Sequence, residues 1–292
     1  MKFYLPLSKI SLSLSILFFA KRLPFSYCIF NLFFDKLKNK KKISGNLKQF
    51  EQNGFVKIDQ SFNYEIDQIK KKLGKKIARN IAVEDYDLSL EDKSNFIELI
   101  KKKLDPLIKD LTFYYNTKPV IVDLNIWTNY NYNNELNKEK KDFMAESFHC
   151  DGYLSNYLKM HINFEDIDKK KGPMTIIKKG YNRQFQKDFK YLDRFSYDKK
   201  RNFDVPYIFV NEGKKGDALL FDSTTCFHCA NIPIKNESRT MMQLIFYIPH
   251  EKIDEINQIK NNFNTYKSKT KPHSFKKTFI LLFKYLKLKL SR

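Results

Sequence analysis

Two short stretches carry residue types that could bind a metal ion. The stretch 147–152 (SFHCDG) places His149 and Asp151 two positions apart. If it forms the end of a strand, both side chains point to the same face. A third ligand must come from elsewhere, and the best candidate is His228, at the end of the stretch 222–228 (DSTTCFH). Two imidazoles and one carboxylate leave coordination positions open, which suits non-haem Fe(II) and oxygen chemistry.

Other interpretations of the same stretches stay open. A histidine and an aspartate at this spacing also occur in surface turns. Cys226 and Cys229 flank His228 in a C-x-x-C pattern, and Cys150 could add a further ligand to a zinc ion. A structural zinc site usually has a second cysteine pair, which this chain lacks. With only four cysteines in the whole chain, we expect a reduced, cytoplasmic protein without a disulfide framework.

Composition limits the classes of protein that fit. Of the 292 residues, 42% are hydrophobic and 15% aromatic, so a packed core is available and general disorder is not expected. The net charge of +21 favours anionic partners, although lysine, asparagine and isoleucine are abundant throughout, as in a biased genome. We find no helix-turn-helix, RNP or zinc-finger pattern and expect no nucleic-acid partner.

Both ends of the chain are apolar and basic. We assign residues 1–46 to an N-terminal segment and 251–292 to a C-terminal tail. The apolar run Ile10–Ala20 is too short to span a bilayer, which takes about 20 apolar residues. Apolar residues alternating with lysines suit helices that lie on an anionic membrane surface, and two such segments anchor better than one. The alternative is that the N-terminal helices pack on the domain. We therefore expect a cytoplasmic location, with a candidate peripheral position on the inner face of a membrane.

The pattern of the central part predicts a mainly β domain with flanking helices, an α+β class. Residues 47–73 have the pattern of a helix, a short strand and a second helix, and residues 91–111 that of an amphipathic helix. The charged segment 181–204 is expected to be an irregular lid or insertion. Short strands at this spacing indicate a sandwich or barrel. The predicted strands are Val120–Tyr130, 147–152, Asn156–Phe164, Met174–Ile177, Pro206–Val210, Asp217–Phe221 and Met241–Ile248.

The strand Asn156–Phe164 has two different faces. Its apolar positions alternate with Lys159, His161 and Asn163, which could line a polar pocket close to the metal motif. His161 is equally explained as a buried histidine with its hydrogen bonds satisfied. Beyond His228, Arg239 lies just before the predicted strand Met241–Ile248, and an arginine there could form a bidentate pair with the carboxylate of a small co-substrate.

The order of these features resembles the phytanoyl-CoA dioxygenase-like family of Fe(II)/2-oxoglutarate-dependent oxygenases. The resemblance covers about Leu47–Pro249, and we assign the oxygenase domain to residues 47–250. Its motifs are Phe50-Glu51-Gln52-Asn53-Gly54-Phe55-Val56, His149-Cys150-Asp151, Leu158-Lys159, Glu165-Asp166-Ile167, Gly172-Pro173-Met174, Gly216-Asp217-Ala218-Leu219-Leu220-Phe221-Asp222, His228 and Arg239.

The resemblance implies a double-stranded β-helix, a cupin-like jelly-roll barrel. It also implies that His149, Asp151 and His228 bind Fe(II) and act as the catalytic centre. Arg239 would hold the distal carboxylate of the co-substrate 2-oxoglutarate, assisted by Lys159. The partners would then be O₂ and a small-molecule or lipid-linked substrate. Because Asp151 is present where related halogenases lack a carboxylate, hydroxylation is the implied reaction.

The chain departs from the family pattern in two places. The family often has Pro-Gly-Ser-His after Gly-Pro-Leu, whereas this chain has Lys178-Lys179-Gly180-Tyr181-Asn182. The chain also lacks the Arg-x-Ser of some relatives after Arg239, so the second co-substrate contact is unassigned. The alternative to an enzyme is a non-catalytic jelly-roll binding protein at a membrane surface. A third hypothesis is a barrel that only presents the basic tails.

Overall fold

The computed structural model describes residues 38, 43, 45–58, 61–132, 143–151, 157–191 and 205–249. Almost all of the segment 1–46 and all of the tail 251–292 lie outside these residues, so their predicted membrane contact stays a prediction. The helices and strands are α3 Gly45–Asn53, β1 Phe55–Ile58, α4 Asn63–Lys70, β2 Lys76–Asn80, β3 Val83–Tyr86, α5 Leu90–Tyr115, β4 Val120–Tyr130, β5 Tyr157–Asn163, β6 Met174–Ile177, α6 Asn182–Asp188, β7 Ile208–Val210, β8 Ala218–Phe221, β9 His228–Ala230 and β10 Ser238–Tyr247.

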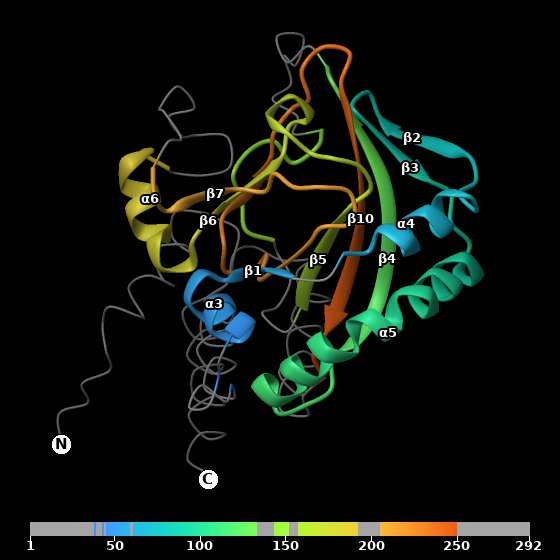
Figure 1. Cartoon of the computed structure of the whole chain (residues 1–292). Coiled ribbons are helices and arrows are strands. Elements are labelled where there is room, and N and C mark those ends of the chain that lie inside the picture. Colours follow the sequence, from blue (N-terminus) through green and yellow to red (C-terminus); the bar gives the residue numbers. More distant parts are fainter. Residues whose placement is uncertain are drawn as a thin grey trace, which may run out of the picture.

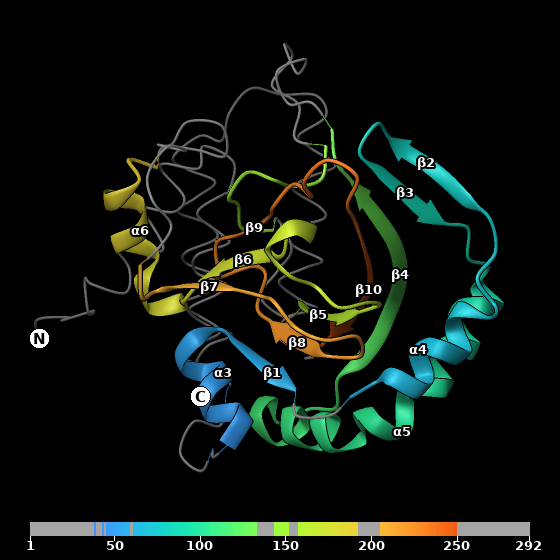
Figure 2. The ribbon, with the colours of Figure 1, turned by 45° about the horizontal axis from the view of Figure 1, so that its top comes forward.

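The strands form two antiparallel sheets. The larger has seven strands in the order β1-β8-β5-β10-β4-β3-β2, and the smaller has three in the order β7-β6-β9. Figure 1 shows the long strands β4 and β10 side by side, and Figure 2 shows the smaller sheet on one side of the larger, with α4 and α5 on the other. Antiparallel strands in two facing sheets are a jelly-roll architecture. The predicted mainly β fold with flanking helices is therefore confirmed.

The main hydrophobic core lies between the larger sheet and the helices. Leu158, Met160 and Ile162 of β5 are fully buried in it, together with Leu244 of β10. Successive strand residues point to opposite faces, so the residues between them point the other way. The predicted division of this strand into an apolar and a polar face is confirmed.

The helix, strand and helix predicted for residues 47–73 are α3, β1 and α4. Gly54 joins α3 to β1 with φ of +78°, a conformation that favours glycine. A Cβ atom there would also collide with the sulfur of Cys226. Gly54 thus brings the N-terminal helix close to the loop that follows β8.

The long helix extends beyond the predicted residues 91–111. It begins at Leu90 because the side chain of Ser89 accepts a hydrogen bond from the backbone of Asp92, and the Asp92 carboxylate accepts one from the backbone of Ser89. It continues to Tyr115, since Tyr114 and Tyr115 are also buried in the core.

The segment 181–204 was expected to be irregular, and this is wrong for its first part. Residues Asn182–Asp188 form α6, because Phe185 and Phe189 are fully buried in a second hydrophobic cluster with Phe148 and Phe227. The aromatic side chains therefore outweigh the charged residues around them. Residues 192–204 lie outside the described part of the chain.

Three strands were not predicted. The strands β2 and β3 form a hairpin that extends the larger sheet beyond β4, and β9 begins at His228. The short, polar strand β2 lacks the apolar alternation of a buried strand, so its pattern is hard to recognise. Among the described residues, no helix is both long and apolar enough to cross a membrane.

Candidate metal centre

The His-x-Asp stretch is not a regular strand, contrary to the prediction. His149 forms an isolated antiparallel bridge with His228, in which each backbone NH donates to the other's carbonyl, at 3.0 and 2.9 Å. The backbone NH of Asp151 donates to the carbonyl of Ser223 at 2.8 Å. These bonds nevertheless place both side chains on one side of the loop, as the prediction required.

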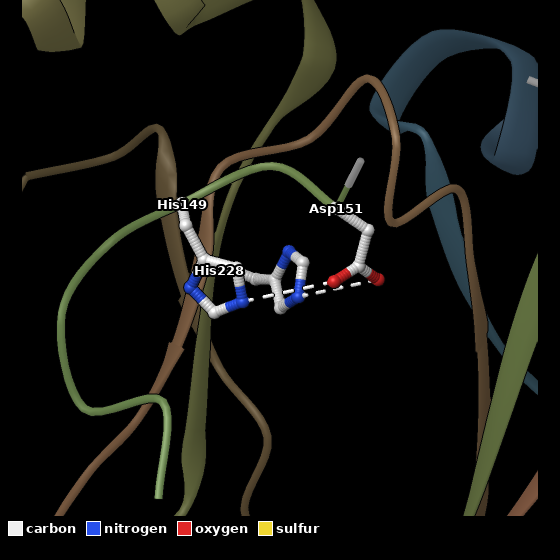
Figure 3. Close-up of side chains that lie close together, drawn as sticks. All are labelled: His149, Asp151 and His228. Carbon is white, nitrogen blue, oxygen red and sulfur yellow. Dashed lines mark ion pairs between the residues drawn. The ribbon is translucent and has the colours of Figure 1, made fainter. Parts of the chain in front are cut away.

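Three side chains converge from two distant parts of the chain (Figure 3). Nε2 of His149 lies 3.7 Å from Oδ1 of Asp151, and Nε2 of His228 lies 3.9 Å from Oδ2 of Asp151. Their candidate ligand atoms all lie within 4.8 Å of one another. Two ligand atoms at about 2.0–2.2 Å from one ion are at most about 4.4 Å apart, so an ion could bridge the separations of 3.7 and 3.9 Å. The donor set therefore fits a divalent metal ion.

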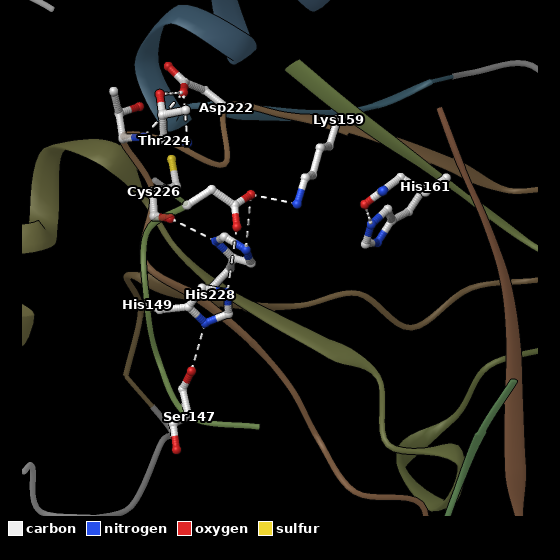
Figure 4. A network of polar contacts seen from close by, with 11 residues as sticks. Ser147, His149, Lys159, His161, Asp222, Thr224, Cys226 and His228 are labelled. Atoms are coloured by element: carbon white, nitrogen blue, oxygen red, sulfur yellow. Dashed lines mark hydrogen bonds and ion pairs between the residues drawn. The ribbon is translucent and has the colours of Figure 1, made fainter. Parts of the chain in front are cut away.

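Both imidazoles are held with Nε2 toward the centre. Nδ1 of His149 lies 2.8 Å from the carbonyl oxygen of Ser147, and Nδ1 of His228 lies 3.0 Å from that of Cys226 (Figure 4). A carbonyl can only accept, so each Nδ1 carries the proton and donates it. In the neutral ring, Nε2 then carries a lone pair that can bind a metal ion.

Burial keeps His228 and His161 neutral. It lowers the pKa of His228 to about 4, although the nearby Asp151 favours the charged form. Burial likewise lowers the pKa of His161 to about 3, and its Nε2 lies 3.1 Å from Oε1 of Gln243. His161 is therefore a buried histidine with a hydrogen-bond partner, and it also lines the cavity described below.

Asp151 is ionised and paired with a lysine. Nζ of Lys159 lies 2.6 Å from its Oδ2, and both side chains are largely buried. Burial disfavours the charged carboxylate, but the neighbouring His228 and Lys159 outweigh that effect and hold the pKa of Asp151 below its usual range. Lys159 thus forms an ion pair with a candidate metal ligand.

A cavity of about 340 Å³ opens between the two sheets beside this cluster. Its size is in the range of small-molecule sites. The polar faces of β4, β5 and β10 form one wall, and β6 and β9 contribute to the other. The polar lining residues are Arg79, Asn125, Trp127, Asn129, His149, Asp151, Lys159, His161, Asn163, Asn211, His228, Arg239 and Gln243.

Arg239 lies in the wall of this cavity. Its residue is only 4% exposed, and neither Nε nor Nη1 has a hydrogen-bond partner among the described residues. Burial lowers its pKa to about 10, which still leaves the guanidinium charged at neutral pH. Buried donors without partners are costly, so this guanidinium fits an anionic ligand.

Asn129 is the neighbour of Arg239 across the sheet, on β4. Its residue is 2% exposed, and its Oδ1 also has no partner in the described structure. The sequence analysis missed this residue, as it missed the cavity residues Trp127 and Gln243. The alternation of β4 and β10 could have pointed to them, since Trp127 and Asn129 share one face of β4, Arg239 and Gln243 share one face of β10, and the register between the strands puts all four on the cavity side of the sheet.

The zinc interpretation is not supported by the described residues. Cys226 packs in a cluster with Phe55, whereas Cys229 packs in the cluster around Phe185. Burial raises the pKa of Cys226 to about 12, which disfavours the thiolate that zinc requires. The group of metal-binding residue types found in this part of the chain contains no cysteine.

No protein-family model matches the chain. No curated protein matches it either. Among solved structures, the chain is similar to HygX from Streptomyces hygroscopicus, with nickel, 2-oxoglutarate and hygromycin B bound: 14% identity, 71% of this chain and 88% of that chain covered, and a TM-score of 0.47. SnoK, a non-haem alpha-ketoglutarate-dependent carbocyclase from nogalamycin biosynthesis, has 13% identity and a TM-score of 0.46. The match covers 76% of this chain and 92% of that chain. AviO1 from Streptomyces viridochromogenes Tue57 has 10% identity and a TM-score of 0.43, and the match covers 70% of this chain and 94% of that chain.

The fold and the site define a class of protein. The chain is a jelly-roll protein with a His-Asp-His cluster beside a cavity between its two sheets. Membership of the phytanoyl-CoA dioxygenase-like family is not confirmed by a family model and stays a proposal.

Proposed function

We propose that this protein is an Fe(II)/2-oxoglutarate-dependent dioxygenase of the phytanoyl-CoA dioxygenase-like kind, which hydroxylates a small-molecule or lipid-linked substrate. One observation carries the proposal. Two histidine Nε2 atoms and a carboxylate converge beside a cavity that also contains a buried arginine with unpartnered donors. A metal-ligand set that leaves positions open, next to an anion-binding group, is what a metal and an acidic co-substrate together require.

His149, Asp151 and His228 would hold the iron. Two imidazole nitrogens and a carboxylate oxygen are the ligands of non-haem Fe(II) sites with open positions, and the hydrogen bonds from Nδ1 to the carbonyls of Ser147 and Cys226 orient the rings. When bound, the metal supplies the oxygen chemistry. The role of the protein is to fix the three ligands and to keep the remaining positions accessible.

Arg239 would bind the distal carboxylate of 2-oxoglutarate. Its planar guanidinium can donate two parallel hydrogen bonds to a carboxylate, and its Nε and Nη1 have no partner among the described residues. We assign the second contact to Asn129. A half turn of its carboxamide would direct the NH₂ group toward the same carboxylate. Both residues come from adjacent strands at paired positions.

The rest of the cavity would orient the substrate and limit access of water. Phe221, Met174 and Met241 provide apolar surface, whereas His161 and Gln243 provide a fixed polar pair. A mixed lining of this kind binds a small molecule by shape and by a few polar contacts. The presence of Asp151 as third ligand supports hydroxylation.

The test is the Fe(II)-dependent conversion of 2-oxoglutarate to succinate by the purified full-length protein. We expect turnover in the wild type, and its loss in His228→Ala, which removes a ligand. Arg239→Gln should raise the KM for 2-oxoglutarate by about 10- to 100-fold, because a charge-assisted bidentate pair is lost.

A matched control is Arg183→Gln, which removes an exposed arginine of α6 and should leave turnover unchanged. Circular dichroism spectra of all variants should equal that of the wild type. A wild-type protein that neither produces succinate nor binds a divalent metal would contradict the proposal and favour a non-catalytic binding protein.

A further inference from the structure

The ammonium group of Lys159 lies where it changes the charge of the candidate metal centre. Nζ is 2.6 Å from Oδ2 of Asp151, and the exposed fractions of the two side chains are 14% and 13%. In Figure 4, Lys159 extends from β5 toward the two histidines. An ion pair this close and this well shielded from water is a strong interaction.

Among the described residues, the pair makes the set of the three ligands and Lys159 electrically neutral. As metal ligands, His149 and His228 would be uncharged, because Nδ1 of each donates to a carbonyl and Nε2 is then free for the metal. Asp151 carries one negative charge and Lys159 one positive charge. A site built only from the three ligands would carry a net charge of −1 and would attract a divalent cation. With Lys159 present, the entering cation meets no net opposite charge and lies close to an ammonium group.

We propose that Lys159 sets the charge balance of this centre, so that a divalent cation binds weakly alone and tightly only together with a dianionic ligand. A dication on this neutral set, together with the charged Arg239, makes three positive charges, and a dicarboxylate bound to Arg239 reduces them to one. This inference rests on the proposed function, because it takes the same three residues as metal ligands. It assigns Lys159 a positioning and electrostatic role, in place of the direct contact with 2-oxoglutarate that the sequence suggested.

Lys159 could act in two ways that predict opposite results. As a hydrogen-bond donor it holds Oδ2 and thereby orients the carboxylate, so its removal would weaken metal binding. As a positive charge it opposes the cation, so its removal would strengthen metal binding. Between largely buried groups a few ångströms apart, the effect of a full charge exceeds that of one hydrogen bond. We therefore expect the charge effect to decide the result.

Two variants separate these effects. Lys159→Gln keeps a hydrogen-bond donor but removes the charge, whereas Lys159→Met removes both at similar length. The readout is the dissociation constant of Mn(II), measured by the loss of the electron paramagnetic resonance signal of the free ion, without turnover. The exposed Lys214, paired with Asp166 at the surface, provides the control variant Lys214→Gln with the same change in net charge.

We expect Mn(II) alone to bind at least about tenfold more tightly to both Lys159 variants than to the wild type, because a buried like charge is removed. Mn(II) affinity of Lys214→Gln should equal that of the wild type. In the metal-loaded protein, 2-oxoglutarate should bind more weakly to both variants, since less positive charge attracts it. This opposite change in two affinities is not expected if Lys159 only supports the fold.

The outcomes distinguish the inference from the proposed function. Unchanged or weaker Mn(II) binding in Lys159→Gln, with the wild-type circular dichroism spectrum retained, overturns the role of Lys159 but leaves the metal centre intact. His228→Ala is the reference for the centre itself. If the wild type binds Mn(II) no better than His228→Ala, with or without 2-oxoglutarate, the metal centre and this inference both fail.

Discussion

At the scale of single residues, the site is held by bonds to groups that have only one possible role. A carbonyl can only accept a hydrogen bond, so the carbonyls of Ser147 and Cys226 determine which nitrogen of each ligand histidine is free. The guanidinium of Arg239 can only donate, and its Nε and Nη1 lack acceptors in the described structure. Each ligand histidine therefore has an Nε2 lone pair that could bind a metal ion, and Arg239 has donors that could bind an anion.

His161 gives a prediction about pH. Burial lowers its pKa to about 3, whereas in the unfolded chain it titrates near 6.5. Between these values the unfolded chain binds a proton that the folded protein excludes. The free energy of unfolding should therefore fall as the pH decreases below 6.5, by up to about 1.4 kcal/mol per pH unit for one proton.

The measurement is urea unfolding of the metal-free protein at several pH values. His161→Gln removes the titrating group but keeps a donor for Oε1 of Gln243. The free energy of unfolding should depend less steeply on pH in this variant. His228 contributes to the dependence that remains, because its pKa is lowered in the same direction. Equal slopes in the two proteins would show that the pKa of His161 is the same in the folded and the unfolded states.

At the scale of elements, the strands of the larger sheet have two distinct roles. One face packs on the helices and provides stability, while the other lines the cavity and carries Lys159 and Arg239. Met160 of β5 is fully buried in the main core, whereas Met241 of β10 borders the cavity. The same type of substitution should therefore have different effects at these two positions.

Met160→Ala should lower the free energy of unfolding by about 2–5 kcal/mol, because it leaves a void in a closed core. The matched variant Met241→Ala should cost less, since its void joins an existing cavity. Chemical denaturation gives both values, and Mn(II) affinity should be retained in Met160→Ala. Equal losses of stability would argue against the separation of the two faces.

At the scale of the whole molecule, the net charge of +21 and the two basic, apolar ends remain to be related to function. We expect the full-length protein to co-sediment with vesicles that contain anionic lipid and not with neutral vesicles. Binding should weaken strongly when the salt concentration is raised above about 0.1 M, where the Debye length is already about 10 Å. Equal binding to neutral vesicles, or none to anionic ones, would refute the predicted membrane contact.

Much of the fold could be predicted from local patterns. The alternation in β5 predicted which residues enter the core, and the positions of β4 and of the α3-β1-α4 unit followed from the change in period along the chain. The helix α6 could not be predicted, because only the packing of Phe185 and Phe189 against distant aromatic residues stabilises it. The hairpin β2-β3 likewise depends on pairing with β4.

For the candidate site, the sequence by itself determined which groups are available and their order: His149, Asp151, His228 and Arg239. Their residue types and spacing suffice for this, since metal and anion binding depend on ligand chemistry. Only the tertiary structure decided that Lys159 pairs with Asp151 and that Asn129 lies beside Arg239. Both neighbours depend on the register between strands and on the path of a loop, which are set by contacts between residues far apart in the chain.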